Sequence, residues 1–477
     1  MKFVDVQFSD FIPDRAGTPW PSDPGYLVDA EDIYPTPNGW RAYAAATNVA
    51  AATAVPSTSG ADIEAAFIER NGTTANIFAM TETTWFQSDD LGVTWNNVTP
   101  ATAVGAVSGW ERFDDLVVIT PFGGQPREKD ITGTVTAQFS DLTGFSGGAV
   151  DVGRIRDHLF IATTTGVRWS SIGDPQDYPT PGGASALASQ AGSETLPGQL
   201  GQTRAVCGGE KFGVVFQQRG ISRFTYVGGD VVYTVDTFEK NIGLGDGQAL
   251  AVKRVGDLFY FTNYEGVFVT DGYSVRRLSY GQIDESLFTG LVSSSDSFVP
   301  SLLSTQSIAV DFARDCVLFA PDGYGKLIGC NYRLNKFFTL SDTTLISLLA
   351  GPSGSSYSDY QLLGFDSSQK LRQFTAAPSA NLQTGFMELV PGRRVRLLGA
   401  HLLGSNYGSP TLAYKAADDP ADIDGVQTGF TSMTAANRDL MSATRDTARF
   451  FAFRVTGISD EQGFLWGMRV FFEPVST

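Results

Sequence analysis

One pattern occurs three times in the middle of the chain: a charged residue, an apolar strand, a loop, and then a glycine before a second strand. The three copies occupy 152–170, 211–224 and 252–270. In each copy the glycine follows a charged residue by the same interval, as Gly166 follows Asp157. Self-similar short strands with a period of roughly 40–55 residues are typical of a β-propeller, in which each repeat is one small sheet.

Length and composition predict an all-β protein with more than one domain. The chain has 477 residues, 52 of them glycine, and only 18% are charged, against about a quarter in an average protein. The strand-like segments in 60–380 predict a β-propeller of six or seven blades, with inserts near 175–197 and 284–304. The pattern changes near residue 380, and 381–477 is predicted to be a C-terminal β-sandwich-like domain. Proline-rich residues 1–59 are predicted to form an extended N-terminal arm.

The net charge of −17 argues against a protein that grips a nucleic-acid backbone through basic side chains. An acidic surface can nevertheless let DNA pass without adhering, because like charges repel. The charge could equally serve solubility alone. The first residues lack the apolar segment of a secretory signal, and no window approaches about 18 apolar residues, so we expect no membrane span.

The cysteines and histidines form no catalytic or metal-binding motif. Cys207, Cys316 and Cys330 are widely spaced among apolar residues, which predicts buried free thiols. His158 and His401 are the two histidines, and His158, beside the start of a strand, is expected to be structural. Histidine often serves as a catalytic base or a metal ligand, and a histidine-based site would have to use one of these two. We therefore expect no catalytic residue, no cofactor and no metal.

The sharpest local motif is an Asp-box of the form Ser-x-Asp-x-Gly-x-Thr-Trp, which occurs in propellers of enzymes and of non-enzymatic receptors. It consists of Ser88, Asp90, Gly92, Thr94 and Trp95. The Asp carboxylate can accept backbone N–H groups in a tight turn, and the glycine can adopt a positive φ. The tryptophan can then pack back onto the hairpin. The motif therefore predicts a structural role.

Arginines raise the possibility of glycosidase chemistry, because a sialidase needs an arginine cluster for a carboxylate. The candidates are Arg154, Arg168, Arg219, Arg223, Arg254 and Arg276. They occupy repeated positions, which favours pairing with the repeated acid. The basic clusters 276–277 and 393–396 could touch DNA or an acidic partner, but alternation along a strand favours a solvated face. The glycines of 243–247 are read as a turn, since no phosphate-loop lysine follows.

Three segments make the chain resemble the tail hub proteins of short-tailed bacteriophages, also called nozzle or packaged-DNA stabilisation proteins. The first is 29–41, similar to the opening Asn-x-Tyr-Pro-x-x-Gly-x-Arg of that family, with Glu31-Asp32 where asparagine is usual. The second runs from Phe212 to Tyr273, and the third is the strand pair 452–455 and 468–470.

The resemblance implies a structural virion protein of the phage tail, made in the host cytoplasm, and it implies no enzyme activity. Six copies are expected to form a hexameric ring below the portal and its adaptor (the head–tail connector), near the tail fibres or spikes. Genomic DNA would pass through the lumen without sequence-specific binding. The N-terminal arm and the C-terminal domain are the candidate contacts between copies. The alternative is a carbohydrate-binding or glycoside-cleaving, sialidase-like propeller; a protein-interaction propeller without a ring is a third possibility.

Overall fold

The computed structural model describes residues 1–13, 25–56, 63–102, 104–178, 190–229, 231–245, 249–263, 265–284, 307–320, 326–341, 345–352, 360–418, 429–435, 441–442, 446–460 and 462–475. The predicted all-β class is confirmed: apart from the short 3-10 helices η2 (Gly198–Leu200) and η3 (Ala249–Ala251), the elements in these ranges are strands. In the same ranges no helix is long and apolar enough to cross a membrane.

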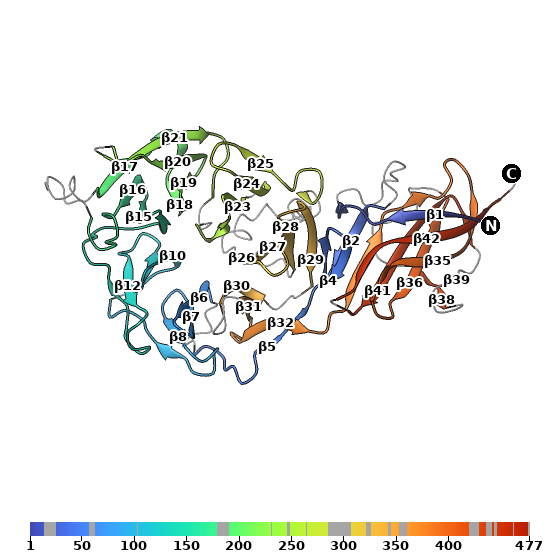
Figure 1. Ribbon diagram of the computed structural model, residues 1–477, viewed down its shortest axis with the longest axis horizontal. Coiled ribbons are helices and arrows are strands. Elements are labelled where there is room, and N and C mark those ends of the chain that lie inside the picture. Colours follow the sequence, from blue (N-terminus) through green and yellow to red (C-terminus); the bar gives the residue numbers. More distant parts are fainter. Residues whose placement is uncertain are drawn as a thin grey trace, which may run out of the picture.

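Seven antiparallel four-stranded units, numbered 1 to 7, can be traced in the described part of the chain (Figure 1). Unit 1 contains β6 (Ala65–Asn71), β7 (Thr74–Met80), β8 (Trp85–Ser88) and β9 (Asn96–Asn97). Unit 2 contains β10 (Val107–Phe113), β11 (Leu116–Pro121), β12 (Arg127–Asp130) and β13 (Ser140–Asp141). Unit 3 contains β14 (Asp151–Ile155), β15 (His158–Thr163), β16 (Gly166–Trp169) and β17 (Gly192–Thr195). Unit 4 contains β18 (Thr203–Cys207), β19 (Phe212–Gln217), β20 (Gly220–Tyr226) and β21 (Tyr233–Glu239).

The remaining units complete the series, and the last one takes a strand from the start of the chain. Unit 5 contains β22 (Val252–Val255), β23 (Leu258–Asn263), β24 (Gly266–Thr270) and β25 (Val275–Arg277). Unit 6 contains β26 (Ser307–Asp311), β27 (Cys316–Ala320), β28 (Leu327–Asn331) and β29 (Lys336–Leu340). Unit 7 contains β30 (Leu345–Pro352), β31 (Tyr360–Asp366), β32 (Leu371–Ala376) and, from the N-terminal segment, β5 (Ala45–Asn48). Of the predicted insert near 175–197, residues 179–189 lie outside the described residues, whereas 192–195 form β17 of unit 3; of the insert near 284–304, only Asp284 is described.

The repeat seen in the sequence corresponds to the first three strands of units 3 and 5 and to the second and third strands of unit 4. Its glycines open the third strands, β16, β20 and β24. A Cβ at Gly166 would lie 2.1 Å from the Glu194 carbonyl oxygen of the fourth strand, and one at Gly266 would lie 2.3 Å from Ser279 Oγ. Glycine therefore recurs here because the neighbouring backbone or loop approaches closely.

The first strands of the units contact one another in cyclic order, and β30 of unit 7 packs against β6 of unit 1. Neighbouring units share apolar cores, as shown by Phe67 with Val117 between units 1 and 2 and Phe216 with Phe261 between units 4 and 5. Ile77 and Phe365 share the core that joins unit 1 to unit 7. We call this arrangement the seven-sheet array; its units surround a common axis (Figure 1).

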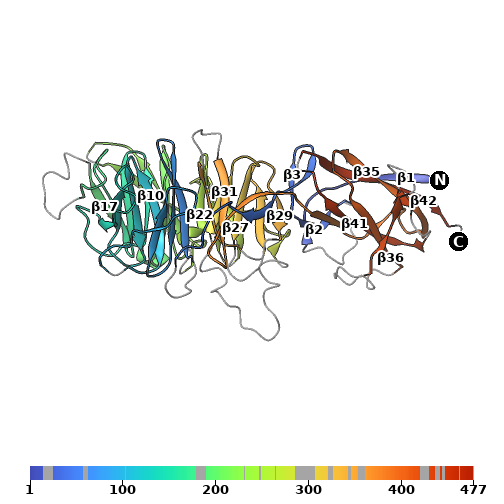
Figure 2. The ribbon, with the colours of Figure 1, turned by 90° about the horizontal axis from the view of Figure 1, so that it is seen from below.

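Beside the array lies a C-terminal module made of two sheets (Figure 2). One sheet contains β1 (Lys2–Gln7), β3 (Ile33–Thr36), β4 (Gly39–Ala42), β35 (Val395–Ser405), β38 (Thr434–Ala435), β39 (Met441–Ser442), β40 (Thr447–Ala448) and β42 (Phe464–Pro474). The other contains β2 (Leu27–Glu31), β33 (Ala380–Thr384), β34 (Met387–Glu388), β36 (Thr411–Ala417), β37 (Thr431–Ser432) and β41 (Phe450–Ile458). Leu397, Tyr414, Phe453 and Val470 belong to the core that both sheets bury.

The N-terminal segment differs from the predicted extended arm. It supplies five strands, and these are divided between the module and unit 7. The strand that contains Pro35 is β3, which lies at the end of its sheet, where a missing N–H removes no ladder hydrogen bond. Proline content alone therefore predicted too little regular structure. Of the prolines counted for the arm, those in 14–24 lie outside the described residues.

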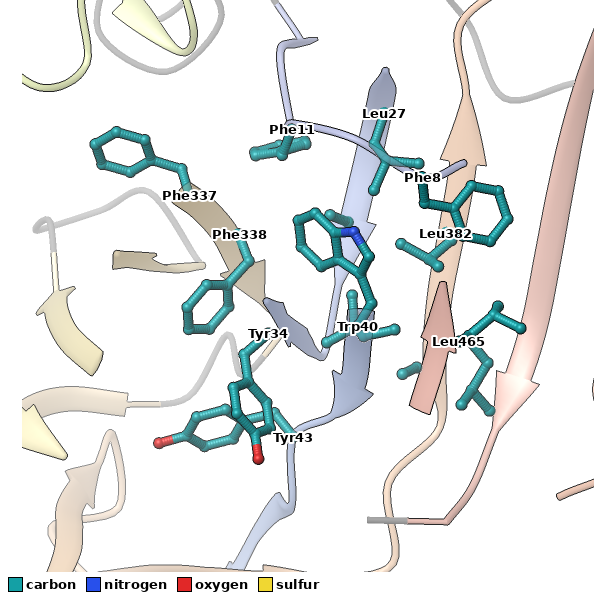
Figure 3. Close-up of a cluster of buried hydrophobic side chains, with 14 of the residues drawn as sticks. Phe8, Phe11, Leu27, Tyr34, Trp40, Tyr43, Phe337, Phe338, Leu382 and Leu465 are labelled. Carbon is teal, nitrogen blue, oxygen red and sulfur yellow. The ribbon is translucent and has the colours of Figure 1, made fainter. Parts of the chain in front are cut away.

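The array and the module are continuous through β2, which pairs in parallel with β29 of unit 6 and antiparallel with β33 of the module. Figure 3 shows the apolar cluster at this junction, in which Trp40 lies among Phe8, Leu382 and Leu465. Trp40 is 1% exposed. The two parts of the molecule therefore share a sheet and a core.

Candidate functional site

The side chains that gather at the axis of the array form the candidate site, which we call the axial site: Glu69, Glu111, Asp151, Cys207 and Lys253. They come from the first strands of units 1 to 5. Two cavities of about 170 and 280 Å³ lie along the axis, and Lys253 borders both of them.

Charge in the axial site is unevenly divided, with one lysine facing three carboxyl groups. Burial raises the pKa of Glu111 to about 7, and the negative charge of Glu69 adds to the rise. Burial also raises the pKa of Glu69 and of Asp151. Lys253 opposes the rise at all three carboxyls, and its ammonium lies 4.9 Å from the ring centre of Trp110. Lys253 is therefore a cation shared by the three carboxyls, and Glu69 has a closer partner in Arg112, whose guanidinium lies 3.3 Å from its carboxylate.

The carboxylates of the axial site tie neighbouring units together. Glu111 of unit 2 accepts the backbone N–H of Arg154 in unit 3 at 3.2 Å. Asp151 of unit 3 accepts the N–H of Val206 in unit 4 at 2.7 Å. A Cβ at Gly109 would lie 1.7 Å from the other oxygen of Asp151, so unit 2 needs glycine there. These contacts give the acids a structural role.

A repeated arginine follows Glu69, Glu111 and Lys253 directly, and in unit 3 it follows Gly153, two residues after Asp151. In Arg70, Arg112, Arg154 and Arg254 the Nε donates to the carbonyl oxygen two residues later, at 2.6 to 2.9 Å. The same guanidinium groups reach the preceding unit: Arg112 donates to the Arg70 carbonyl, and Arg254 to the Gly208 carbonyl at 3.4 Å. The arginine thus fixes its own turn and joins it to the turn before.

The six arginines considered for sialidase chemistry do not gather at the axis. Arg154 forms ion pairs with Asp114 at 3.6 Å and with Asp157 at 3.8 Å, and Arg254 reaches Asp257 at 4.0 Å. The other four lie on later strands or turns and contact other groups: Arg168 the Ser146 carbonyl, Arg219 the Gln199 carbonyl, Arg223 the Asp236 carboxylate and Arg276 the Asn335 amide oxygen. The predicted pairing with the repeated acid is therefore present at Arg154 and Arg254.

The Asp-box forms the turn between β8 and β9. Asp90 Oδ1 accepts the N–H of Thr94 at 2.9 Å, and the Ser88 hydroxyl both donates to that oxygen at 2.7 Å and accepts the N–H of Gly92 at 2.8 Å. Gly92 has a φ of +83°. The Trp95 indole packs against the core between units 1 and 7 and donates to the Thr53 carbonyl at 3.3 Å. The motif joins a hairpin to the segment that leads out of β5.

The cysteines are free, as the sequence predicted; Cys316 and Cys330 are buried and Cys207 is half-buried. His158 is buried, with Nδ1 2.7 Å from the Ser170 carbonyl oxygen, and burial lowers its pKa. His401 lies on β35, opposite Arg469 of β42. Across the residues that the structure describes, no group of three His, Cys, Asp or Glu side chains could hold a metal ion.

Sequence reasoning missed the axial site although its signal was present. Glu69, Glu111 and Lys253 each precede a repeated arginine directly, and Cys207 occupies the corresponding position in unit 4. The repeat drew attention to the arginines and to the glycines. Because the units surround an axis, one repeated position per unit must point inward, and this position could have been read from the alignment of the copies.

Comparisons with known proteins identify no family. No protein family model matches the sequence, and no curated protein matches it. Among solved structures, a "Mitotic Checkpoint Complex" chain aligns with a TM-score of 0.43 and 7% identity over 72% of this chain and 98% of that one. The "AfRom2 CNH domain" aligns with a TM-score of 0.41 and 9% identity over 69% and 97%. The computationally designed Ika8 protein gives 0.39 and 10% over 68% and 98%.

Proposed function

We propose that this chain is a structural component of a virion, a tail hub or nozzle protein of a short-tailed bacteriophage. In this proposal the seven-sheet array is a closed seven-bladed β-propeller and the module is a β-sandwich. Several copies, six in the family, surround the channel below the portal and its adaptor, retain the packaged DNA and conduct it during ejection. The protein performs no catalysis.

The continuity of the array and the module carries this proposal. The sheet of unit 6 continues through β2 into the module, and β5 completes unit 7. A body joined in this way resists bending between its two parts, since relative motion would break backbone hydrogen bonds and open a shared core. A ring component that bears load during ejection needs this stiffness.

Two of the segments that resemble the tail hub family meet at this junction. Residues 29–41 form β2, β3 and β4, while 452–455 and 468–470 lie in β41 and β42. Strand β33 pairs with β2 at Ala30 and with β41 at Val455, both inside these segments, while β4 pairs with β42 at Leu465, next to them. The resemblance therefore lies where the two parts of the molecule are joined.

The charge distribution agrees with a channel that DNA passes without adhering. Residues 60–380 contain 34 Asp and Glu against 22 Lys and Arg, whereas 381–477 contain 10 against 9. The array thus holds most of the excess negative charge. We propose that the loops lining the channel are acidic or neutral, so that phosphate groups are repelled rather than bound.

The alternative is a glycoside-cleaving or carbohydrate-binding propeller, and the elevated pKa of Glu111 beside Asp151 is the observation that favours it. A general acid needs such a carboxyl, and a second carboxylate would serve as nucleophile or base. Both groups are engaged by backbone N–H donors of neighbouring units, which favours the structural role.

Gold-labelled antibodies on purified particles test the proposed function. Labelling at the tail tip, with several copies per particle, is the expected result. Particles without the protein would refute it. Turnover of a tail-accessible glycan by the purified chain, lost in Glu111→Gln with the fold retained, would establish the alternative instead.

A further inference from the structure

The end of the module farthest from the array carries a basic and apolar patch, which we call the tip: Lys2, Phe3, Arg393, Arg396 and Val475. Strand pairing brings these residues together, since Lys2 lies opposite Phe472 and Arg396 opposite Glu473. The Val475 N–H donates to the Arg394 carbonyl at 3.3 Å. Figure 1 places both chain ends at this extremity.

The tip is exposed, and most of its charge is unpaired. Phe3 is 57% exposed and Val475 is 37% exposed. Within the described residues Lys2, Arg393 and Arg396 form no ion pair, whereas neighbouring Arg394 pairs with Asp418 at 2.7 Å. Glu473 is the acid nearest to Arg396 along the sheet. At Phe3 itself the guanidinium of Arg469, which pairs with Asp5 at 2.6 Å, lies 4.5 Å from the ring centre. Exposed arginines and aromatic side chains are characteristic of the centre of protein–protein interfaces.

The array presents an acidic face that complements the tip. In a four-stranded antiparallel sheet the turn between strands 1 and 2 (the first turn) and the turn between strands 3 and 4 (the third turn) lie at the same end of the sheet. Contacts between successive first turns, such as Arg154 with Asp114 at 3.6 Å and Lys211 with Asp257 at 3.0 Å, align these ends around the axis. Exposed acids in these turns, within the described residues, are Asp89, Asp90, Asp114, Asp115, Asp130, Asp157, Asp174, Glu210, Asp257 and Asp271.

Few exposed bases balance this acidic face. In the described ranges, the exposed basic residues of the same turns are Arg156, Lys211 and Arg333. Asp115 and Glu210 form no ion pair there. The repeated arginines are half-buried and already hold their own turns. The face therefore offers unpaired carboxylates to a basic partner.

We propose that the tip of one copy docks on the acidic face of a second copy. The two patches lie on different parts of one elongated chain, so the contact is heterologous and propagates from copy to copy, closing into a ring if the rotation permits. A nucleic-acid backbone would satisfy the arginines but would leave Phe3 and Val475 in water, which favours the protein partner. The inference rests on the proposed function only in that both require several copies.

Sedimentation of the full chain at low and high salt tests the docking. Wild type is expected to associate at low salt and to dissociate as salt screens the charges. The variant Arg393→Glu/Arg396→Glu is expected to associate more weakly, so that the protein concentration at which half of the chains are associated rises at least about tenfold. The matched control Arg219→Glu/Lys240→Glu introduces the same charge on exposed residues outside both patches and is expected to behave as wild type.

Charge exchange makes the test specific for the two surfaces. Asp115→Lys/Glu210→Lys should weaken association alone, and an equimolar mixture with the Arg393→Glu/Arg396→Glu chain should restore it. Unfolding curves matching wild type would show that each variant is folded.

The inference would be overturned if wild type sedimented as a monomer at low salt, or if the tip variant associated as strongly as wild type. Binding of DNA by the tip without self-association would also overturn it. Association through these patches in a chain absent from virions would refute the proposed function and leave this inference standing.

Discussion

Removing one hydroxyl group, in Tyr43→Phe, tests how firmly the N-terminal segment is locked to the array. Tyr43 lies between β4 and β5 and is fully buried. Its hydroxyl donates to Asp311 Oδ2 at 2.6 Å. Burial first, and the Asp311 charge second, raise the pKa of this phenol well above its usual value. The group therefore stays protonated as a donor.

The expected decrease in the free energy of unfolding is calculated from a single hydrogen bond, because phenylalanine retains the ring contacts of Tyr43. Tyr43 stacks on Phe338 at 6.0 Å and meets Phe374 edge-on at 5.7 Å. A hydrogen bond to a charged group contributes about 1.5–3 kcal/mol. Arg314 remains paired with Asp311 at 2.9 Å, so the carboxylate keeps a partner. We predict a loss of about 1.5–2 kcal/mol, near the lower end of that range.

Urea unfolding measures this loss as a lower midpoint with an unchanged slope. Tyr414→Phe is the matched control, since its hydroxyl also donates to a carboxylate at 2.6 Å, that of Asp446. Asp446 is exposed and can be rehydrated, so the control should lose about 1 kcal/mol or less. A loss below about 0.5 kcal/mol for Tyr43→Phe, or a larger loss for the control, would refute the reasoning.

Three further predictions concern the array. Burial raises the pKa of Glu111 to about 7, so the folded chain holds its proton and the stability that this group contributes is lost as pH rises from about 4.5 to about 7; wild type should therefore lose stability relative to Glu111→Gln over that range in urea titrations, and parallel curves would contradict it. Gly208→Ala should cost at least about 2 kcal/mol, since its Cβ would lie 1.6 Å from the Arg154 carbonyl oxygen, whereas Gly198→Ala, with open space, should be neutral by thermal melting. Asp90→Ala should cost about 1 kcal/mol through the lost turn bonds, measured by urea unfolding, and a neutral result would remove the Asp-box from the structural account.

Features set by local chemistry could be predicted from the sequence. The hairpin of β6 and β7 follows from two apolar runs separated by Asn71-Gly72, where Gly72 has a φ of +57°. The repeat located the first three strands of units 3 and 5 and the second and third strands of unit 4, since each copy carries a charged residue and a glycine at the same interval. The Asp-box turn follows from side chains only a few residues apart.

Features set by pairing between distant segments could not be predicted. Strand β5 joins β32 and β2 joins β33, across more than three hundred residues, and short strands carry no signal for such partners. The axial site has the same origin, because Glu69 and Lys253 approach only when the units surround the axis. Prolines in the N-terminal segment hid strands that pair at a sheet edge.

A cryo-electron-microscopy reconstruction of the particle tail tests the central claim most directly. The account predicts several copies around the DNA channel, each with its array and module in the orientation seen here, and with channel-lining loops that are acidic or neutral. A tail without this chain, or a channel lined by its lysines and arginines, would contradict it.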